Sequence, residues 1–322
     1  MTDIADRKYD IADRCAGSIL GTAFGDALGA GVEGWTSEEI KNEYGEVCDY
    51  IGCRMGAGYY TDDTQMTLAM LRSIVRTGGI DGADCAACCA EAFDPERGYG
   101  RSASEIMKAL NEGTSYTETG NMLFPDGSYG NGAAMRIAPV GLLCGEMDPS
   151  LMRSWVFESV RSTHTHDEAV DGALVLAAVI GCLSRLVDAS GFDPSAFLLG
   201  LSPYCRTMEL RSRIMLAARL LGEELTPEEV VAQLGNGVRT LESVPTALYT
   251  AFRYIDDPEQ ALVAAVGYGG DTDTIAAMTG AVVGALHGAD LFPRRWHDGL
   301  ERGTHGYETL RDLSSQLAKM IK

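Results

Sequence analysis

Two short acidic segments are the strongest chemical signal in the sequence. Residues 61–64 read TDDT and residues 271–274 read DTDT, and each segment stands before an almost wholly apolar run. Helix capping explains either segment alone, because threonine and negative charge are favoured at helix N-termini. Carboxylates from both segments, brought together, would repel by about 4 kcal/mol per pair at about 4 Å with an effective dielectric of about 20. Mg²⁺, Ca²⁺ or Mn²⁺ prefers oxygen ligands and would remove that repulsion, so the sequence predicts a two-metal site.

A glycine-rich loop is the second signal. Residues 128–132 read SYGNG and run into a helix that we expect to begin at Ala133. Backbone N–H groups at a helix start bind anions, and a diphosphate is the natural guest. The loop matches neither common phosphate-loop pattern, so an ordinary Asn-Gly turn is the competing interpretation. Tyr129 is placed to border or stack on a ring of such a ligand.

Two further polar residues are candidates because of their neighbours in sequence. Glu33 lies between glycines, as expected for a mobile flap that brings a carboxylate over a site, and a solvated loop acid is the simpler alternative. His164 and His166 form a His-x-His pair that lacks a third metal ligand nearby. Two interpretations of this segment remain. Either Thr165 or His166 caps the next helix, or the segment makes a polar contact with a substrate.

The elements that must position these residues read as helices. Two caps agree with this, because Thr226-Pro227 and Asp257-Pro258 are each followed by the acidic or amide residues typical of a helix N-terminus. Apolar residues at intervals of three and four predict helices over Ile11–Ala30, Gln65–Thr77, Gly82–Phe93, Ser102–Asn111, Asp167–Val187, Thr207–Leu221, Val244–Ile255, Thr274–His287 and Thr309–Ile321. Alternating β-branched runs are scarce, so we expect an all-α fold that forms one compact domain over residues 1–322.

Two of these helices carry small residues at a spacing of four. Each such glycine costs a helix interior about 1 kcal/mol relative to alanine, so its presence needs a reason. The glycines are Gly17, Gly21, Gly25 and Gly29 in the first helix and Gly280, Gly284 and Gly288 in the last long apolar one. They predict a close approach of helix backbones, which would make a rigid support for whatever lies at the helix ends.

Composition excludes several classes of protein. The chain has 322 residues, 46% of them hydrophobic, and a net charge of 26 − 46 = −20, which disfavours binding of long nucleic acids or anionic membranes. Its longest uncharged apolar stretches, Ala173–Leu183 and Ile275–Leu286, are too short for a membrane span. The N-terminal residues contain no secretion signal, and the nine cysteines do not resemble a disulfide framework. We therefore expect a cytoplasmic protein with reduced thiols, in which Cys85, Cys88 and Cys89 are buried in a helix.

Five sequence blocks, in order, resemble the ADP-ribosylglycohydrolase family, which includes the dinitrogenase reductase activating glycohydrolase. They are GSILGTAFGDALGAGVE, YTDDTQMTLAM, SYGNGAAMRIAPVG, THTHDEAV and GGDTDTIAAMTGAVVGALHG, and they span the chain from Gly17 to about residue 288. The resemblance implies an all-α orthogonal helical domain with two Mg²⁺ or Mn²⁺ ions. It implies metal ligands at Thr61, Asp62, Asp63, Asp271, Asp273 and Thr274. It also implies that Ser128, Tyr129, Gly130, Asn131 and Gly132 hold the diphosphate and adjoining ribose of ADP-ribose.

The same resemblance implies an activity and its remaining residues. The expected reaction is hydrolysis of the glycosidic bond between ADP-ribose and a modified side chain, with arginine favoured over serine, or a small conjugate. The metals would bind the ribose hydroxyls, Asp62 or Asp63 would polarise a water, and Glu33 would act near the scissile bond. His164 would contact the substrate, while Asp26 receives no direct role. The expected partner is an ADP-ribosylated protein or conjugate, and we expect a monomer.

Two other classes of protein are the alternatives. A catalytically inactive ADP-ribose-binding protein of the same fold would need no complete metal site, yet every implied ligand is present in the sequence. An all-α prenyl diphosphate enzyme would also use acidic segments and Mg²⁺. The segment that begins at Asp62 lacks the third aspartate usual in such enzymes, and the glycine-rich loop would be unexplained.

Overall fold

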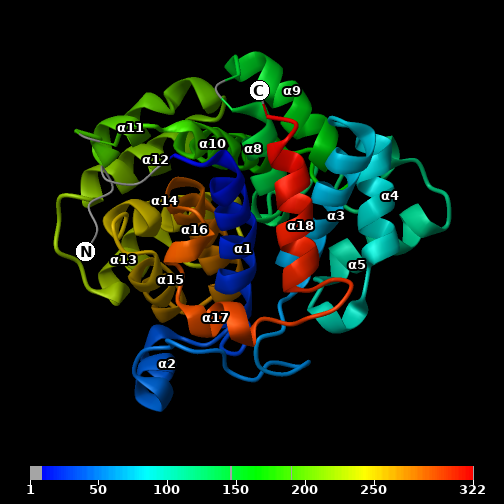
Figure 1. The fold of residues 1–322 in the computed structure, drawn as a ribbon. Helices are drawn as coiled ribbons and strands as arrows, with labels where there is room; N and C mark the ends of the chain where they lie inside the picture. The colour runs from blue at the N-terminus through cyan, green and yellow to red at the C-terminus, as the bar shows by residue number, and fades with distance from the viewer. Residues whose placement is uncertain (1–8, 146, 190, 322) are drawn as a thin grey trace.

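The computed structural model describes residues 9–145, 147–189 and 191–321, and in these residues it forms helices joined by turns and loops (Figure 1). The described chain contains no strand, only the isolated bridges Thr36–Gly269 and Gly130–Arg239. The all-α prediction is confirmed. Residues 1–8, for which the sequence predicts no targeting signal, lie outside the described residues. No helix in the described part combines the length and apolarity that crossing a bilayer requires.

The α-helices follow in chain order. They are α1 (Ile11–Gly29), α2 (Ser37–Tyr44), α3 (Asp62–Thr77), α4 (Gly82–Ala92), α5 (Arg101–Asn111), α6 (Tyr116–Thr119), α7 (Gly132–Met135), α8 (Ala138–Cys144), α9 (Pro149–Val160), α10 (Asp167–Arg185), α11 (Pro194–Gly200), α12 (Met208–Leu220), α13 (Pro227–Leu234), α14 (Thr240–Arg253), α15 (Pro258–Gly267), α16 (Thr272–His287), α17 (Arg294–Gly299) and α18 (Tyr307–Ala318). Short 3₁₀ turns occur at Pro95–Arg97, Ser202–Tyr204 and Ala289–Leu291.

Both predicted N-terminal caps are present. Thr226 forms a complete capping box with Glu229 at the start of α13, and the side chain of Asp257 accepts a hydrogen bond from the Gln260 N–H at the start of α15. The observed helix boundaries differ from the predicted ones by a few residues. For example, α16 begins at Thr272, two residues before the expected Thr274. The helix expected from Ala133 is present as α7, which begins one residue earlier and is only four residues long. Helix α6 is too short to show a periodicity and was not predicted, and the 12-residue helix α9 was not predicted either.

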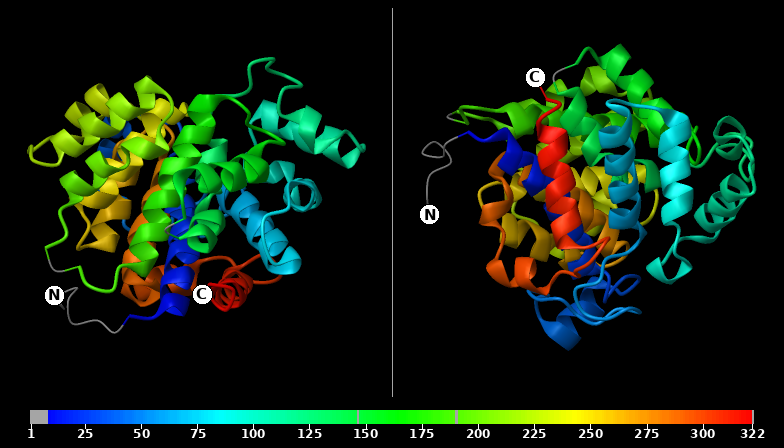
Figure 2. Two further views of the ribbon diagram at one scale, coloured as in Figure 1. Left: turned by 90° about the horizontal axis from the view of Figure 1, so that it is seen from above. Right: turned by 45° about the vertical axis from the view of Figure 1, so that its right-hand side comes forward.

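Helices α1 and α16 form the centre of the molecule and run antiparallel with their backbones in contact (Figures 1 and 2). A Cβ atom at Gly21 would overlap the carbonyl oxygen of Gly280, and one at Gly17 would overlap that of Gly284. Gly25 meets the backbone of Ala276 in the same way. The close approach that the glycine spacing predicts is therefore present along the whole length of the pair.

This contact sets the position of the start of α16. A Cβ at Gly29, the last residue of α1, would lie 2.5 Å from the backbone nitrogen of Asp273. The Thr272 hydroxyl donates to the Gly29 carbonyl at 2.9 Å, and the Ser18 hydroxyl donates to the Ala281 carbonyl at 2.9 Å farther along. Helices α10, α14 and α15 pack against α16, while α3 and α18 pack against α1. The acidic segment at residues 271–274 is thus held against the end of α1.

The cysteines agree with the interpretation from sequence. None of the nine forms a disulfide within the described residues, and Cys85, Cys88 and Cys89 are buried in α4. Burial raises the pKa of Cys89 to about 12, so its thiol stays protonated and weakly reactive at neutral pH.

Candidate active site

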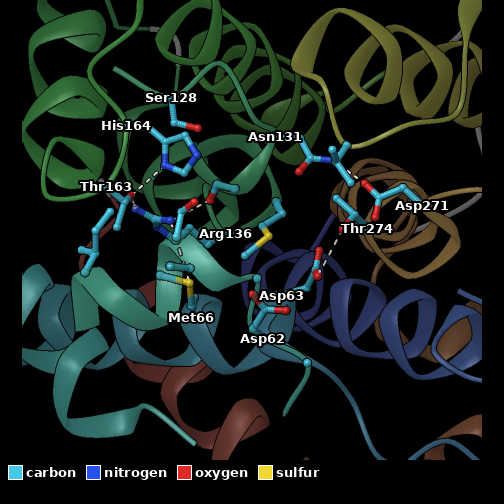
Figure 3. Close-up of a pocket in the computed structure, with 18 of the residues that line it drawn as sticks. Asp62, Asp63, Met66, Ser128, Asn131, Arg136, Thr163, His164, Asp271 and Thr274 are labelled. Atoms are coloured by element: carbon cyan, nitrogen blue, oxygen red, sulfur yellow. Dashed lines mark hydrogen bonds between the residues drawn. The ribbon is translucent and has the colours of Figure 1, made fainter. Parts of the chain in front are cut away.

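A pocket of about 300 Å³ lies where the beginnings of α3 and α16 face the glycine-rich loop (Figure 3). Most of the candidate residues line it. They are Glu33, Asp62, Asp63, Ser128, Asn131, Gly132, His164, Asp271, Asp273 and Thr274. Segments more than 200 residues apart in the sequence therefore meet in one cavity.

Asp26, on α1, holds the first turn of α3. Its carboxylate is fully buried and accepts hydrogen bonds from the backbone N–H of Thr61 at 2.8 Å and from that of Thr64 at 2.9 Å. It also accepts from the Thr64 hydroxyl at 2.6 Å. Thr61, the N-cap residue, makes no side-chain cap of its own. Asp26 therefore caps α3 from a neighbouring helix and fixes the orientation of Asp62 and Asp63.

Asp63 connects the two acidic segments. Its Oδ2 atom accepts a hydrogen bond from the Thr61 hydroxyl at 3.2 Å and one from the Thr274 hydroxyl at 3.3 Å (Figure 3). Its Oδ1 atom is buried and has no hydrogen-bond partner among the residues that the structure describes. A buried carboxylate oxygen without a donor is costly, and a bound cation is one way to satisfy it.

Burial raises the pKa values of the four aspartates at the starts of α3 and α16, and neighbouring acids add to the effect. Burial, followed by the charge of Asp26, raises the pKa of Asp62 to about 7. Burial raises the pKa of Asp271 to about 6, although the hydrogen bond from Asn131 opposes this. Burial and neighbouring carboxylates also raise the pKa of Asp63 and that of Asp273 well above the usual range. Within the described residues, none of these four carboxylates forms an ion pair with a lysine, an arginine or a histidine.

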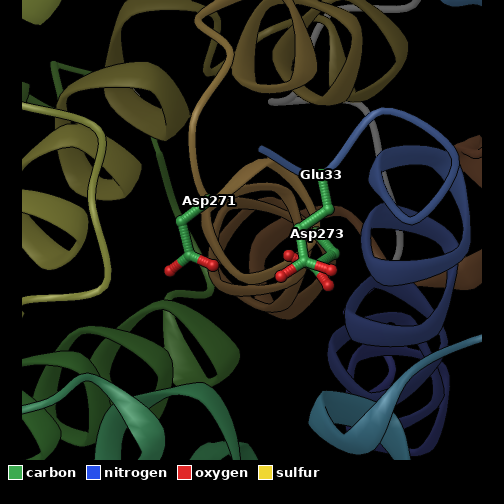
Figure 4. A group of neighbouring side chains, drawn as sticks. All are labelled: Glu33, Asp271 and Asp273. Carbon is green, nitrogen blue, oxygen red and sulfur yellow. The ribbon is translucent and has the colours of Figure 1, made fainter. Parts of the chain in front are cut away.

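Glu33 joins this cluster from the other side. Ligand oxygens of Glu33, Asp271 and Asp273 lie within 4.8 Å of one another, and the three carboxylates converge in Figure 4. Glu33 is exposed, whereas the two aspartates are buried. The sequence predicted Glu33 near the site, but not this close approach to Asp271 and Asp273.

The Glu33 segment is tied to the loop before α16. The Gly34 N–H donates to the Gly270 carbonyl at 2.8 Å, and the Gly270 N–H donates to the Trp35 carbonyl at 2.8 Å. Gly269 and Gly270 have φ angles of +69° and +72°, which glycine adopts without strain. The backbone that carries Glu33 and the backbone that carries Asp271 are consequently joined.

The donor set fits hard divalent cations. It consists of carboxylate and hydroxyl oxygens, and it contains no cysteine or histidine among the described residues of the acidic cluster. Mg²⁺ and Mn²⁺ prefer such ligands. The unpartnered Asp63 Oδ1 and the raised pKa values of the aspartates are what a site built around added positive charge shows without that charge.

The glycine-rich loop forms the opposite wall. The Asn131 N–H donates to the Val238 carbonyl at 3.0 Å, and the Gly130 N–H donates to the Ser128 hydroxyl at 3.2 Å. The Asn131 side-chain amide donates to Asp271 at 2.5 Å, which joins the loop to the acidic cluster. The helix that follows, α7, is only four residues long, so its dipole contributes little, and anion binding would rest on local N–H groups such as that of Gly132.

His164 packs over this loop. Its Nδ1 atom lies 2.7 Å from the Thr163 hydroxyl, which in turn accepts a hydrogen bond from Arg136 at 2.5 Å. Burial, followed by the charge of Arg136, lowers the pKa of His164 to about 3. The imidazole is therefore neutral at physiological pH and suited to hydrogen bonding rather than charge pairing.

Three candidate residues lie outside the pocket lining. Thr61 lies behind Asp63, and Gly130 pairs with Arg239 through a β-bridge. Tyr129 is 54% exposed, with the Arg239 guanidinium 5.1 Å from its ring centroid.

His166 is the N-cap of α10, where its side chain accepts from the Glu168 N–H, so the capping interpretation of that residue agrees with the structure.

Sequence reasoning missed three residues that shape the site. Asp26 was given no role, although an acid inside an apolar, glycine-rich helix is a signal in itself. Arg136 and Thr163 line the pocket but stood out by neither type nor spacing.

Comparison with known proteins gives consistent matches over nearly the whole chain. The family model described as ADP-ribosylglycohydrolase matches residues 7–322. Human ADP-ribosylhydrolase ARH3 is 30% identical over 350 residues, covering 96% of this chain and 94% of that protein. The ADP-ribosyl-dinitrogen reductase glycohydrolase of Rhodospirillum rubrum is 30% identical over 292 residues, covering 89% of this chain and 90% of that protein. A solved chain described as an ADP-ribosylglycohydrolase-related protein complex aligns with a TM-score of 0.75 at 27% identity, covering 97% of this chain and 99% of that one.

Proposed function

This chain belongs to the ADP-ribosylglycohydrolase family and is a glycohydrolase, and we propose that its pocket hydrolyses the glycosidic bond between ADP-ribose and a modified arginine side chain. One observation carries the proposal: the pocket has two unlike walls. Buried carboxylates that form no ion pair within the described residues make one wall, and a glycine-rich loop makes the other. ADP-ribose has two matching parts: its diphosphate would lie on the loop, and the vicinal hydroxyls of its ribose would face the carboxylates. Family membership leaves no reason to retain the prenyl diphosphate alternative.

The carboxylate wall would hold two divalent cations, Mg²⁺ or Mn²⁺. The residues that would hold them are Thr61, Asp62, Asp63, Asp271, Asp273 and Thr274, and the position of Glu33 adds a carboxylate beside Asp271 and Asp273. Such ions, when bound, orient hydroxyl groups and lower the pKa of a water. The unpartnered Asp63 Oδ1 and the raised aspartate pKa values support this assignment.

The chain's own groups would divide the remaining work. Glycoside hydrolysis passes through an oxocarbenium-like transition state, and the fixed negative charge of Asp62 and Asp63 stabilises positive charge that develops beside it. Asp26 holds both aspartates in place through its bonds to the start of α3. One of the two aspartates would accept the proton of the attacking water. Glu33, which is exposed at the pocket, would position the substrate or assist proton transfer at the leaving group.

The arginine linkage is the finer part of the proposal. A guanidinium leaving group is cationic, and the Glu33 carboxylate at the pocket offers it a partner. The net charge of −20 favours the approach of a cationic side chain rather than a neutral serine ether. ADP-ribosyl-serine and small conjugates are the alternatives that the test must separate.

The test is release of ADP-ribose from two matched peptides, one modified on arginine and one on serine. Each is assayed after chelation and again after Mg²⁺ or Mn²⁺ is returned. We expect release from the arginine peptide only with the cation, and sharply reduced release by the Asp273→Asn variant. Faster release from the serine peptide would overturn the linkage. Binding of ADP-ribose without any release would identify an inactive binding protein of the same fold instead.

A further inference from the structure

Arg136 is a buried cation that forms no salt bridge with an acid among the described residues. Of the other buried arginines, Arg97 and Arg153 pair with Glu301 and Asp171 respectively, while Arg14 donates to backbone carbonyls. Arg136 makes no ion pair within the described residues, and its side chain is 1% exposed at the floor of the pocket. Burial lowers its pKa. An unpaired arginine in such a place needs a function other than charge pairing.

The guanidinium joins the two pocket elements that do not carry metal ligands. One terminal nitrogen donates to the Gly132 carbonyl at 2.7 Å, in the glycine-rich loop. The other donates to the Thr163 hydroxyl at 2.5 Å, next to His164 (Figure 3). Arg136 therefore sets the position of the loop relative to the histidine.

The Thr163 hydroxyl decides which ring nitrogen of His164 carries the proton. Its oxygen lies 2.7 Å from His164 Nδ1 and 3.2 Å from the Val160 carbonyl. That carbonyl already accepts the backbone N–H groups of Thr163 and His164, both at 3.0 Å. The Thr163 hydroxyl therefore donates its single proton to Nδ1, the nearer acceptor, because both lone pairs of the Val160 carbonyl are already occupied.

The charge of Arg136 favours the same arrangement. A guanidinium that donates to the Thr163 oxygen polarises the hydroxyl and strengthens it as a donor. The Nδ1 lone pair then faces the cation, whereas an Nδ1–H would present like charge to it. We propose that Arg136 and Thr163 are positioning residues that hold His164 as the neutral tautomer with its proton on Nε2.

This tautomer gives the pocket a fixed hydrogen-bond donor. A Cβ built on Gly132 would lie 3.2 Å from His164 Nε2, and one built on Gly130 would lie 3.8 Å from it, so Nε2 lies over the glycine-rich loop. An Nε2–H there donates to an oxygen of an anion on the loop, whereas a bare nitrogen would repel it. This step rests on the proposed function, because the anion is the diphosphate of ADP-ribose.

The tautomer is measured by ¹⁵N NMR of the histidine rings in the protein without ligand. His166 serves as an internal standard, because its Nδ1 accepts the Glu168 N–H at 3.2 Å independently of Thr163. The variants are Thr163→Val, which removes the hydroxyl but keeps the shape, Thr163→Ser, which restores the hydroxyl, and Arg136→Met.

We expect wild type and Thr163→Ser to show an unprotonated Nδ1 on His164. Thr163→Val and Arg136→Met should show a mixture of tautomers, with the His166 signals unchanged. A proton on Nδ1 in the wild type would overturn the inference, even if a variant fails to fold. So would a His164 signal that Thr163→Val leaves unchanged.

Binding supplies the second readout. The dissociation constant for ADP-ribose, measured by calorimetry, should rise about tenfold in Thr163→Val and return to near the wild-type value in Thr163→Ser. In the release assay, KM should rise while kcat changes little. An altered tautomer with unchanged affinity would overturn the role of the Nε2–H but not the hydrolase activity. Absence of release in every protein, with the tautomers as expected, would overturn the hydrolase proposal alone.

Discussion

Two fully buried aspartates perform the same structural task in opposite electrostatic surroundings. Asp26 caps α3 from α1, and Asp171 caps α12 from α10 by accepting bonds from the backbone N–H groups of Arg206 and Thr207 at 2.8 and 2.7 Å. Asp171 is paired with the buried Arg153. Asp26 forms no salt bridge within the described part of the chain, and its charge raises the pKa of Asp62 in the acidic cluster.

This difference between Asp26 and Asp171 distinguishes a buried acid that only stabilises the fold from one that belongs to a functional site. At α12, the fold supplies both members of the ion pair, so that region is electrostatically complete without a ligand. At α3, the fold collects carboxylates and leaves the positive charge to come from outside. A buried acid whose counter-charge is missing is thus a stronger functional signal than burial alone.

The largest expected effect on stability comes from removing the charge of Asp171, which pairs with Arg153. Asp171→Asn should lower the free energy of unfolding by about 3 kcal/mol, because it removes the buried counter-charge of Arg153 and leaves only the exposed Asp167 to pair with it. Asp26→Asn should cost about 1 kcal/mol or less in chelated protein, because it loses a capping bond but relieves like-charge repulsion. Urea unfolding in EDTA measures both. Equal losses would show that the two acids do not differ in the way described.

Removing one member of the incomplete cluster should affect activity rather than folding. Asp273→Asn should reduce turnover at least about 100-fold, which corresponds to about 2.7 kcal/mol. Its melting temperature in EDTA should stay the same or rise, because one repelling carboxylate is gone. The release assay and a thermal melt provide the two measurements. Normal turnover with Mg²⁺ present would refute the assignment of Asp273 to the metal site.

The third prediction concerns a substitution that displaces the acidic cluster by changing the contact between α1 and α16. Gly21→Ala should cost about 1–3 kcal/mol of stability and reduce turnover, because its Cβ forces α1 away from the Gly280 carbonyl. Gly200→Ala is the matched control, since a Cβ at this last residue of α11 meets nothing within 4 Å. It should be neutral or stabilise by about 0.5 kcal/mol. If both variants kept full activity, the helix contact would not position the site.

The last prediction concerns the dependence of stability on pH. A carboxyl whose pKa is higher in the folded state binds protons more tightly there than in the unfolded chain. Chelated protein should therefore lose stability as the pH rises from about 4 towards 7, by at most about 1.4 kcal/mol per pH unit for each such group. The pKa values of about 7 for Asp62 and about 6 for Asp271 place most of the change in that window.

Added Mg²⁺ should flatten this slope, because a cation favours the ionised carboxylates. Asp62→Asn should flatten it partly even in EDTA. Thermal melts at pH 5, 6 and 7, with EDTA or with Mg²⁺, provide the comparison. An identical slope with and without the cation would argue that no cation binds at the cluster.

The sequence alone was sufficient for most of the long helices, although not for α9, and for the nature of the central contact. Regular apolar spacing predicted α3, α10 and α16, and glycines at intervals of four predicted the close approach of α1 and α16, because both signals lie within a single helix. Charge repulsion predicted that the acidic segments needed cations. It did not predict that the Thr274 hydroxyl would bond to Asp63.

What the sequence did not reveal depends on contacts between distant segments. Asp26 lies 35 residues before the Thr61 N–H that it caps, so no local capping pattern includes it. Thr163 and Arg136 meet across 27 residues and carry no motif of their own. The close approach of Glu33 to Asp273 likewise exists only once α1 and α16 have packed.

The pairing of α1 with α16 has a consequence for the order of folding on the ribosome. Helix α1 ends at Gly29 and its partner begins at Thr272, so nearly the whole chain separates the two halves of the central contact. At synthesis rates of about 5–20 residues per second, α1 would wait on the order of 10–50 s before α16 emerges. During that interval, its small-residue face has no partner, and contacts of such high sequence separation form slowly. Synthesis of the last quarter of the chain is therefore the step at which the acidic pocket is first assembled.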